Sequence, residues 1–262
     1  NRFSVTFDTY QKLTTGLLLD SNVPGYTGFT TVTRNIGEVK NSGTELSVKS
    51  FNLDTKDFTW TTTLNISTIK NEITKLEQDN ERAVGGTNIM KEGYPLGTFY
   101  LIHWEGVDPQ TGNSLYTDAN GDGVINSGDM QLVKDKTPWP DYFGGIGNSL
   151  SWKGFDLNVF FQFSIGNYIF NHSRYAQEQV GWSFNYGGFF IPYGNNTERV
   201  ENERWQNPGD VTDIPRASLG YEFDEEGNVV STLQPNWMED CDQWLEDASY
   251  IRLKTFEFGY TV

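Results

Sequence analysis

The sequence predicts an all-β fold in which about six antiparallel strands with long loops form a segment of a large transmembrane β-barrel. Three observations lead to this prediction. Segments of ten to eleven residues alternate between apolar and polar side chains, and short and long connections alternate along the chain. No run approaches the ~18 consecutive apolar residues that a membrane-spanning helix needs.

The clearest strand is predicted over Phe155–Ile165. All its odd-numbered positions are apolar, and its even-numbered positions are polar except for Phe160. Phe58–Ser67 alternates in the same way, with its apolar side chains at even positions. Both segments have the ~9–11 residues that a tilted strand needs to cross a bilayer, about twice the length of strands in soluble sheets.

Four weaker segments complete the predicted set of six strands. In the last of them the apolar residues move from odd positions, at Ile251 and Leu253, to even positions from Phe256 onward, which predicts a bulge near Lys254 or Thr255. The four segments are Arg2–Tyr10, Val39–Phe51, Gly145–Trp152 and Tyr250–Val262.

The connections predict a direction for each strand. Residues 52–57 and 153–154 are short turns, whereas residues 16–36, 71–143 and 167–249 are long connections. Because outer-membrane barrels keep short turns in the periplasm and long loops outside, we expect these loops to be extracellular. Aromatic residues near the short turns then predict a periplasmic girdle: Phe51, Phe58, Trp60, Trp152 and Phe155.

Six strands do not close a barrel of useful bore, and an open sheet edge cannot face lipid. We therefore expect residues 1–262 to be part of one β-barrel domain, with the remaining strands in chain missing from this sequence. The alternative is a soluble, secreted β-sandwich that binds glycan. Its strands would be shorter, and it would have to accommodate two loops of more than seventy residues.

Composition restricts the function further. The net charge of −16 and the pI of about 4.4 disfavour nucleic acid and anionic lipid as partners. Cys241 is the single cysteine and cannot form an internal disulfide. His103 and His172 lack metal-ligand spacing, and the glycine-rich segments do not match phosphate-binding loops. We therefore do not expect an enzyme.

The strongest local motif, DANGDGVINSGD, spans residues 118–129. Its oxygen-bearing side chains fall at positions 1, 3, 5, 9 and 12, with Gly at position 6 and a carbonyl ligand at position 7, as in calcium loops. The simpler alternative is an Asx-Gly turn without an ion. The predicted ligands of a structural Ca²⁺ are Asp118, Asn120, Asp122, Val124, Asn126 and Asp129.

The last long loop is rich in aromatic residues. Such rings in a polar loop suit stacking on sugars or contact with a partner protein, but they can also pack on each other to hold the loop rigid. The candidate substrate or partner residues are Trp182, Phe184, Tyr186, Phe189, Tyr193, Trp205 and Trp237.

Several stretches together resemble the SusC/RagA-like TonB-dependent outer-membrane transporters of Bacteroidota. They follow the order of the family along nearly the whole chain. The matching stretches include YQKLTTGLLL (10–19), NIGEVKNSGTEL (35–46), DFTWTTTLN (57–65), GYPLGTFY (93–100), the 106–129 segment, RWQNPGDVTDIPR (204–216) and ASYIRL (248–253).

The resemblance implies a plugged barrel of about 22 strands in the outer membrane, of which this chain is a late segment. It also implies import of oligosaccharides or peptides with a SusD-like surface lipoprotein, and energy from TonB through a plug domain that is not in this chain. A surface barrel that acts as a scaffold or adhesin, without transport, is the alternative.

Overall fold

The computed structural model describes residues 2–22, 28, 31–76, 82–84, 86–178, 183–186, 189–192, 197–217, 221–223, 229–232, 236 and 240–261. These residues belong to two compact units. Unit 1 comprises Asn1–Phe99, Val133–Ile169 and Asp247–Val262, and unit 2 comprises Tyr100–Leu132 and Phe170–Glu246.

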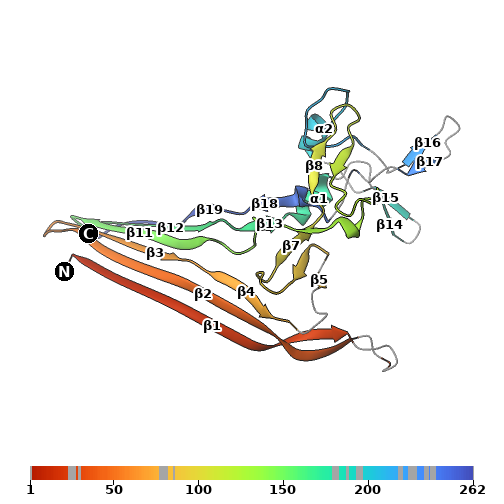
Figure 1. Ribbon diagram of the computed structural model, residues 1–262. Coiled ribbons are helices and arrows are strands. Elements are labelled where there is room, and N and C mark those ends of the chain that lie inside the picture. Colours follow the sequence, from red (N-terminus) through yellow and green to blue (C-terminus); the bar gives the residue numbers. More distant parts are fainter. Residues whose placement is uncertain are drawn as a thin grey trace. The chain divides into compact units, whose positions relative to one another are not determined.

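Unit 1 is built on one antiparallel sheet that contains all six predicted strands (Figure 1). The sheet order is β1-β2-β3-β11-β12-β19, and a further strand, β4 (Lys70–Lys75), pairs with β2. The all-β prediction is therefore confirmed, and the sheet stays open at both edges. The six strands are β1 (Phe3–Asn22), β2 (Thr31–Asp54), β3 (Phe58–Ser67), β11 (Tyr142–Trp152), β12 (Phe155–Ile165) and β19 (Tyr250–Tyr260).

The predicted long connection over residues 16–36 is wrong, because β1 and β2 continue as a paired hairpin through most of it. Leu17 pairs with Gly37 and Leu18 with Asn35, with shifts of register on both sides of Leu17. Gly16, at φ +69°, takes a backbone conformation that is costly for other residues. Gly16, the first residue of the predicted connection, instead allows an irregularity within the strand.

The predicted bulge in β19 is confirmed. Phe160 pairs with Thr255 and Phe161 pairs with Leu253, so Lys254 is the extra residue. Because the bulge shifts the alternation by one residue, apolar side chains on both sides of Lys254 share one face of the sheet.

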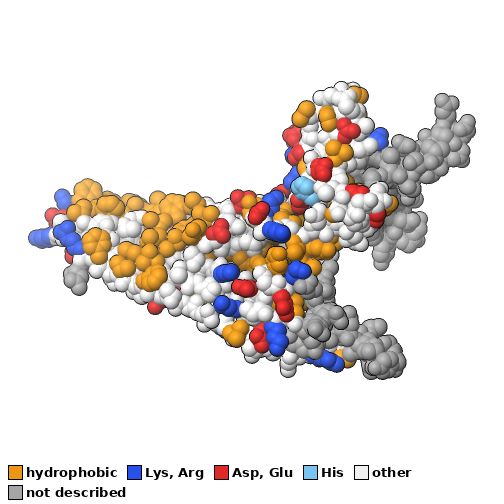
Figure 2. Space-filling model, in the orientation of Figure 1, with side chains coloured by type: hydrophobic (Ala, Val, Ile, Leu, Met, Phe, Trp, Pro, Cys, Tyr) orange, Lys and Arg blue, Asp and Glu red, His pale blue; other side chains and the backbone are white. Residues whose placement is uncertain are grey.

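The register brings the apolar positions of neighbouring strands opposite each other. Leu150 of β11 lies between Trp60 and Leu157, and Leu157 in turn faces Phe258 of β19. Many of these side chains are well exposed, including Phe7 at 62% and Phe258 at 67%. Figure 2 shows the resulting concentration of apolar side chains over the sheet. Such a largely apolar surface is costly in water and suited to lipid contact.

Phe160, the exception in the β12 pattern, is explained by glycines on the neighbouring strand. A methyl group at Gly145 would collide with the Phe160 ring, and one at Gly147 would lie 3.5 Å from it. A methyl group at Gly144 would collide with the carbonyl of Asn65. The glycines of β11 therefore permit close approach of the neighbouring strands, and the Phe160 ring fills the space above them.

The rest of unit 1 packs beside the extended hairpin. Val39, Ile73 and Leu76 form a buried cluster, with Leu17 and Leu96 packed against it. Three short strands follow β4 in the chain, and another follows β12. They are β5 (Arg82–Val84), β6 (Asn88–Met90), β7 (Thr98–Leu101) and β13 (Tyr168–Phe170).

Unit 2 contains the loop structures and its own small core. Ile102, Val200, Ile214, Cys241 and Trp244 are fully buried, and burial raises the pKa of the Cys241 thiol to about 12. The short helices have neither the length nor the apolar character to cross a membrane within the described residues. The elements are β8 (Trp104–Val107), β9 (Ser114–Tyr116), η2 (Ser127–Asp129), β10 (Gln131–Leu132), α1 (His172–Glu178), β14 (Ser183–Tyr186), β15 (Phe189–Pro192), α2 (Glu198–Glu203), β16 (Tyr221–Phe223), β17 (Val229–Thr232), η3 (Asp242–Trp244) and β18 (Leu245–Asp247).

Candidate functional site

The 118–129 loop curls around its own side-chain oxygens. Asp118 accepts the backbone N–H of Gly121 at 2.7 Å and that of Gly123 at 2.8 Å through its two carboxylate oxygens. Asn120 accepts the N–H of Asp122 at 2.8 Å, and Asp122 in turn accepts the N–H of Val124 at 2.8 Å. Successive Asx turns therefore bring the first three predicted ligands to the inside of one tight loop.

The second half of the loop ends in a capped 3₁₀ turn. Asn126 caps η2, and its side-chain oxygen accepts the N–H of Gly128 at 2.7 Å. Asp129 is fully buried and accepts N–H groups from Ala119, Asn120 and Asn126. The bond from Asn126 is the main cause that holds the pKa of Asp129 below its usual value, against the opposing effect of burial.

The order of the turns along this loop is the same as in a calcium loop. In the described part of the chain, however, no three His, Cys, Asp or Glu side chains come together closely enough to hold a metal ion. Amide and backbone oxygens, from Asn120, Asn126 and Val124, would therefore have to supply part of a ligand set. The hydrogen bonds fit either alternative, so Ca²⁺ stays a prediction.

Trp205 is the one predicted loop aromatic whose side chain is described. Its indole N–H donates to the carbonyl of Pro109 at 2.9 Å, and its ring lies where a methyl group on Gly112 would be. Trp205 thus packs on the turn between β8 and β9. The side chains of Trp182, Phe184, Tyr186, Phe189, Tyr193 and Trp237 lie outside the described residues.

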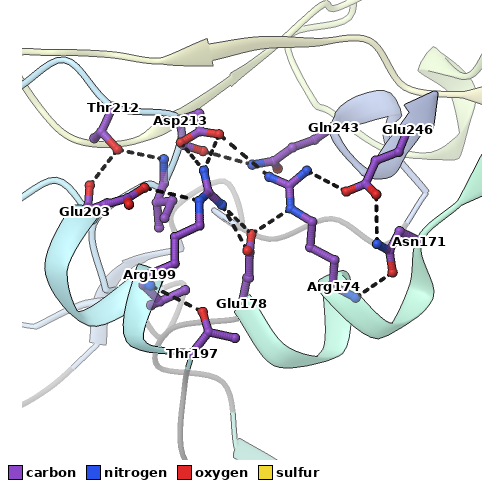
Figure 3. A network of polar contacts seen from close by, with 12 residues as sticks. Asn171, Arg174, Glu178, Thr197, Arg199, Glu203, Thr212, Asp213, Gln243 and Glu246 are labelled. Carbon is purple, nitrogen blue, oxygen red and sulfur yellow. Dashed lines mark hydrogen bonds and ion pairs between the residues drawn. The ribbon is translucent and has the colours of Figure 1, made fainter. Parts of the chain in front are cut away.

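A network of charged side chains joins the helices of unit 2 to the segment that follows them (Figure 3). We call Arg174, Glu178, Arg199, Asp213 and Glu246 the polar clamp. Glu178, with 7% of its side chain exposed, accepts from Arg174 at 2.9 Å and from Arg199 at 2.9 Å. Arg199 also donates to Asp213 at 2.6 Å, and Arg174 to Glu246 at 3.1 Å.

Each arginine of the clamp contacts three carboxylates: Arg174 those of Glu178, Asp213 and Glu246, and Arg199 those of Glu178, Glu203 and Asp213. Burial opposes the charge of Arg199, but hydrogen bonds to Glu178 and Asp213 outweigh this effect and raise its pKa. Sequence analysis missed the clamp because its members are up to 72 residues apart. The only local signals were the i,i+4 pairs of Arg174 with Glu178 and of Arg199 with Glu203.

An open groove of about 660 Å³ lies beside the clamp in unit 2. Its wall includes Trp104, whose indole N–H is buried and has no hydrogen-bond partner among the described residues. Val211 lies at its rim and is 94% exposed. The remaining lining residues are Gly106, Glu203, Thr212 and Asp213. An apolar side chain displayed beside acidic groups is suited to contact with a ligand or partner.

Comparisons with known proteins agree with this architecture. TonB-dependent receptor P3 of Formosa agariphila is 31% identical over the whole chain, and TonB-dependent receptor SusC of Bacteroides thetaiotaomicron is 31% identical over 99% of it. The structure of the RagAB peptide transporter matches 99% of the chain, with a TM-score of 0.76 and 28% identity. No family model matches the chain.

The chain spans about a quarter of the length of these relatives: 26% of P3, 24% of SusC and 27% of the matched RagAB chain. The chain therefore belongs to the SusC/RagA-like TonB-dependent receptors.

Proposed function

We propose that this chain forms part of the wall and the external loops of an outer-membrane importer. The observation that carries the proposal is the six-stranded sheet, whose aligned positions form one largely apolar face opposite a polar one. A sheet with one face for lipid and one for a water-filled lumen is the wall of a transmembrane barrel. The similarity to TonB-dependent receptors supports the same placement.

The proposed cargo is an oligosaccharide or a peptide. The RagAB structures describe a peptide transporter, which favours peptides, but the relatives extend beyond RagAB. Energy would come from TonB through a plug domain in a part of the protein outside this chain.

The proposed partner is a SusD-like surface lipoprotein that covers the outer opening of the barrel. The groove beside Trp104 and the exposed Val211 support a role for unit 2 in this contact, because Val211 offers an apolar anchor next to acidic groups. Replacing Val211 with Asp should lower the recovery of the lipoprotein with the tagged full-length receptor. Leu115→Asp, at another exposed apolar residue of unit 2, serves as the control.

Ca²⁺ is proposed as a structural ion of the 118–129 loop. Bound there, the ion would neutralise the acidic loop and fix its outer turns. The residues that would hold it are Asp118, Asn120, Asp122, Val124, Asn126 and Asp129.

Uptake in intact cells tests the transport proposal. Labelled oligosaccharides and oligopeptides would be supplied to wild-type cells, to cells without the full-length receptor and to cells without TonB. Import predicts that both deletions abolish uptake of the same cargo. Uptake of every cargo that is unchanged in both deletion strains, with loss of adhesion only in the receptor deletion, would instead identify a scaffold or adhesin.

A further inference from the structure

Unit 1 contains a pocket of about 200 Å³ at the end of the sheet where the long connection between β3 and β11 begins and ends. Its lining comes from three segments: residues 69–71 at the start of β4, Gly93 and Pro95 before β7, and residues within the 137–141 segment before β11. The pocket is smaller than the ~300–1,000 Å³ of sites that enclose a drug-sized molecule. It therefore suits a single side chain or sugar unit of a longer ligand.

The register places this pocket on the polar face of the sheet. Asn71, which lines the pocket, lies opposite Asn41 of β2. Because side chains alternate along a strand, Asn41 shares a face with Ser47, which lies opposite Asn65 on the polar side of β3. In the proposed barrel this face borders the lumen, so the pocket lies on the path of imported cargo.

Hydrogen bonds inside the protein hold the walls of the pocket. Trp139 Nε1 donates to the carbonyl of Leu96 at 2.8 Å, and the N–H of Leu96 donates to Asn71 Oδ1 at 2.7 Å. Asn71 Nδ2 donates to Asn41 Oδ1 at 2.7 Å, and Thr137 Oγ1 accepts the N–H of Trp139 at 3.3 Å. The neutral polar side chains of the lining are therefore engaged within the protein, beside the apolar surface of the Trp139 ring.

Asp141 gives the pocket a negative charge. Asp141 is exposed, and its carboxylate accepts no hydrogen bond and forms no ion pair with the residues that the structure describes. Lys70 also belongs to the lining, but its Nζ lies 3.5 Å from a carboxylate oxygen of Glu72 and its side chain is 76% exposed. Alternation along β4 directs the Lys70 side chain to the face opposite Asn71. The carboxylate of Asp141 is therefore the charge that the pocket offers to a ligand.

We propose that this pocket binds an ammonium group of a peptide cargo, with Asp141 as its counter-ion and the Trp139 ring against the adjoining methylene groups. An ammonium group is stabilised by a carboxylate and by an aromatic face. A sugar unit instead carries several hydroxyl groups that each need a partner, whereas the neutral polar groups here are already engaged. The inference rests on the proposed import function and narrows its cargo to peptides with a lysine or a free amino terminus.

Binding of synthetic peptides to the full-length receptor tests this proposal. The first probe is an octapeptide of Gly and Ser with blocked ends and one central lysine. The second has norleucine in place of lysine, and the third has norleucine and a free amino terminus. By isothermal titration calorimetry at low salt, the wild type should bind the first or the third peptide about ten-fold more tightly than the second, as expected for one ammonium–carboxylate contact beside an aromatic ring. A gain with either ammonium group supports the proposal and identifies its source.

Asp141→Asn should abolish this preference and leave the affinity for the second peptide unchanged. The substitution keeps the shape of the side chain and breaks no contact among the described residues. Asp135→Asn is the matched control, because Asp135 is exposed in the same connection but does not line the pocket, and it should keep the preference.

Equal affinity of the wild type for all three peptides would overturn the proposal, and so would a preference that persists in Asp141→Asn. Displacement of the peptides by a neutral oligosaccharide in the wild type but not in Trp139→Leu would also overturn it and assign the pocket to a sugar. Uptake in cells separates this inference from the proposed function. TonB-dependent import of the three peptides at equal rates would refute only the ammonium site, whereas import that is unchanged without the receptor would refute the proposed function.

Discussion

Replacing Glu178 with Gln tests whether the polar clamp holds unit 2 together. The substitution keeps the shape of the side chain and one acceptor oxygen but removes the charge that Arg174 and Arg199 share. Both arginines keep another carboxylate, Glu246 for Arg174 and Asp213 for Arg199. The substitution therefore weakens the clamp without leaving either cation unpaired.

The expected cost follows from the number and burial of the bonds. Hydrogen bonds to charged groups contribute about 1.5–3 kcal/mol each, and removal of one member of a buried pair costs about 3–5 kcal/mol. The remaining carboxylates and the partial exposure of both arginines reduce this cost. We expect a loss of about 2 kcal/mol in the local stability of unit 2, which is about a 30-fold rise in the open population.

Native-state hydrogen exchange of the full-length receptor measures this change. Amides of α1 and α2 should exchange about 30-fold faster in Glu178→Gln, whereas amides of β11 and β12 should be unaffected. Glu203→Gln is the matched control, because Glu203 also pairs with Arg199 but is 57% exposed and should change exchange little. Equal effects of the two substitutions would refute the central role of the buried carboxylate.

Three further predictions concern the loops of unit 2. Ca²⁺ should protect the 118–129 loop from proteolysis in the wild type, and chelator or Asp122→Ala should remove the protection; cleavage unchanged by both would rule out the ion. Gly112→Ala should destabilise the turn under Trp205 by about 1–3 kcal/mol, because the glycine has φ +72° and a methyl group would strike the ring, and tryptophan fluorescence during unfolding measures this. Hydrogen bonds from the N–H of Gln110 and the hydroxyl of Thr111 lower the pKa of Asp108 from its usual 3.8. The turn should therefore be fully stabilised above pH 3.8 and should loosen as the pH falls through the lower pKa of the folded state. Exchange of the Gln110 amide that does not depend on pH in this range, after correction for intrinsic rates, would contradict this.

Strand positions were predictable because the strands of a sheet with one apolar and one polar face repeat a simple physical constraint. In β12 every second side chain belongs to the apolar face, so the alternation from Phe155 to Ile165 is visible in the sequence alone. The same constraint revealed the bulge at Lys254, since a shift in the alternation has to be matched by an extra residue.

The extended part of the β1–β2 hairpin lacked this constraint. Beyond Thr15 the strands are stabilised by pairing with each other and by the cluster around Val39, so their sequence does not alternate regularly. Gly16 was placed in the predicted connection but is part of an irregular pair of strands. The extended part of the hairpin is therefore determined by pairing between residues distant in the sequence, which the local alternation of side chains does not reveal.

The candidate site was only partly predictable. The 118–129 loop was recognisable because its glycines and oxygen-bearing side chains are close in sequence. The clamp depends on contacts between α1, α2 and the segment before β19, which no local spacing encodes.

The orientation of β12 in a bilayer tests the central claim most directly. Single cysteines at positions 156–164 of the full-length receptor would carry spin labels. Cys241 should not react with the label, because its thiol is buried and has a pKa of about 12. The protein without an added cysteine is the control for labelling at Cys241. Oxygen should reach the odd positions and a water-soluble relaxation agent the even ones, with a period of two residues. Access of the water-soluble agent to odd and even positions alike would contradict a membrane wall.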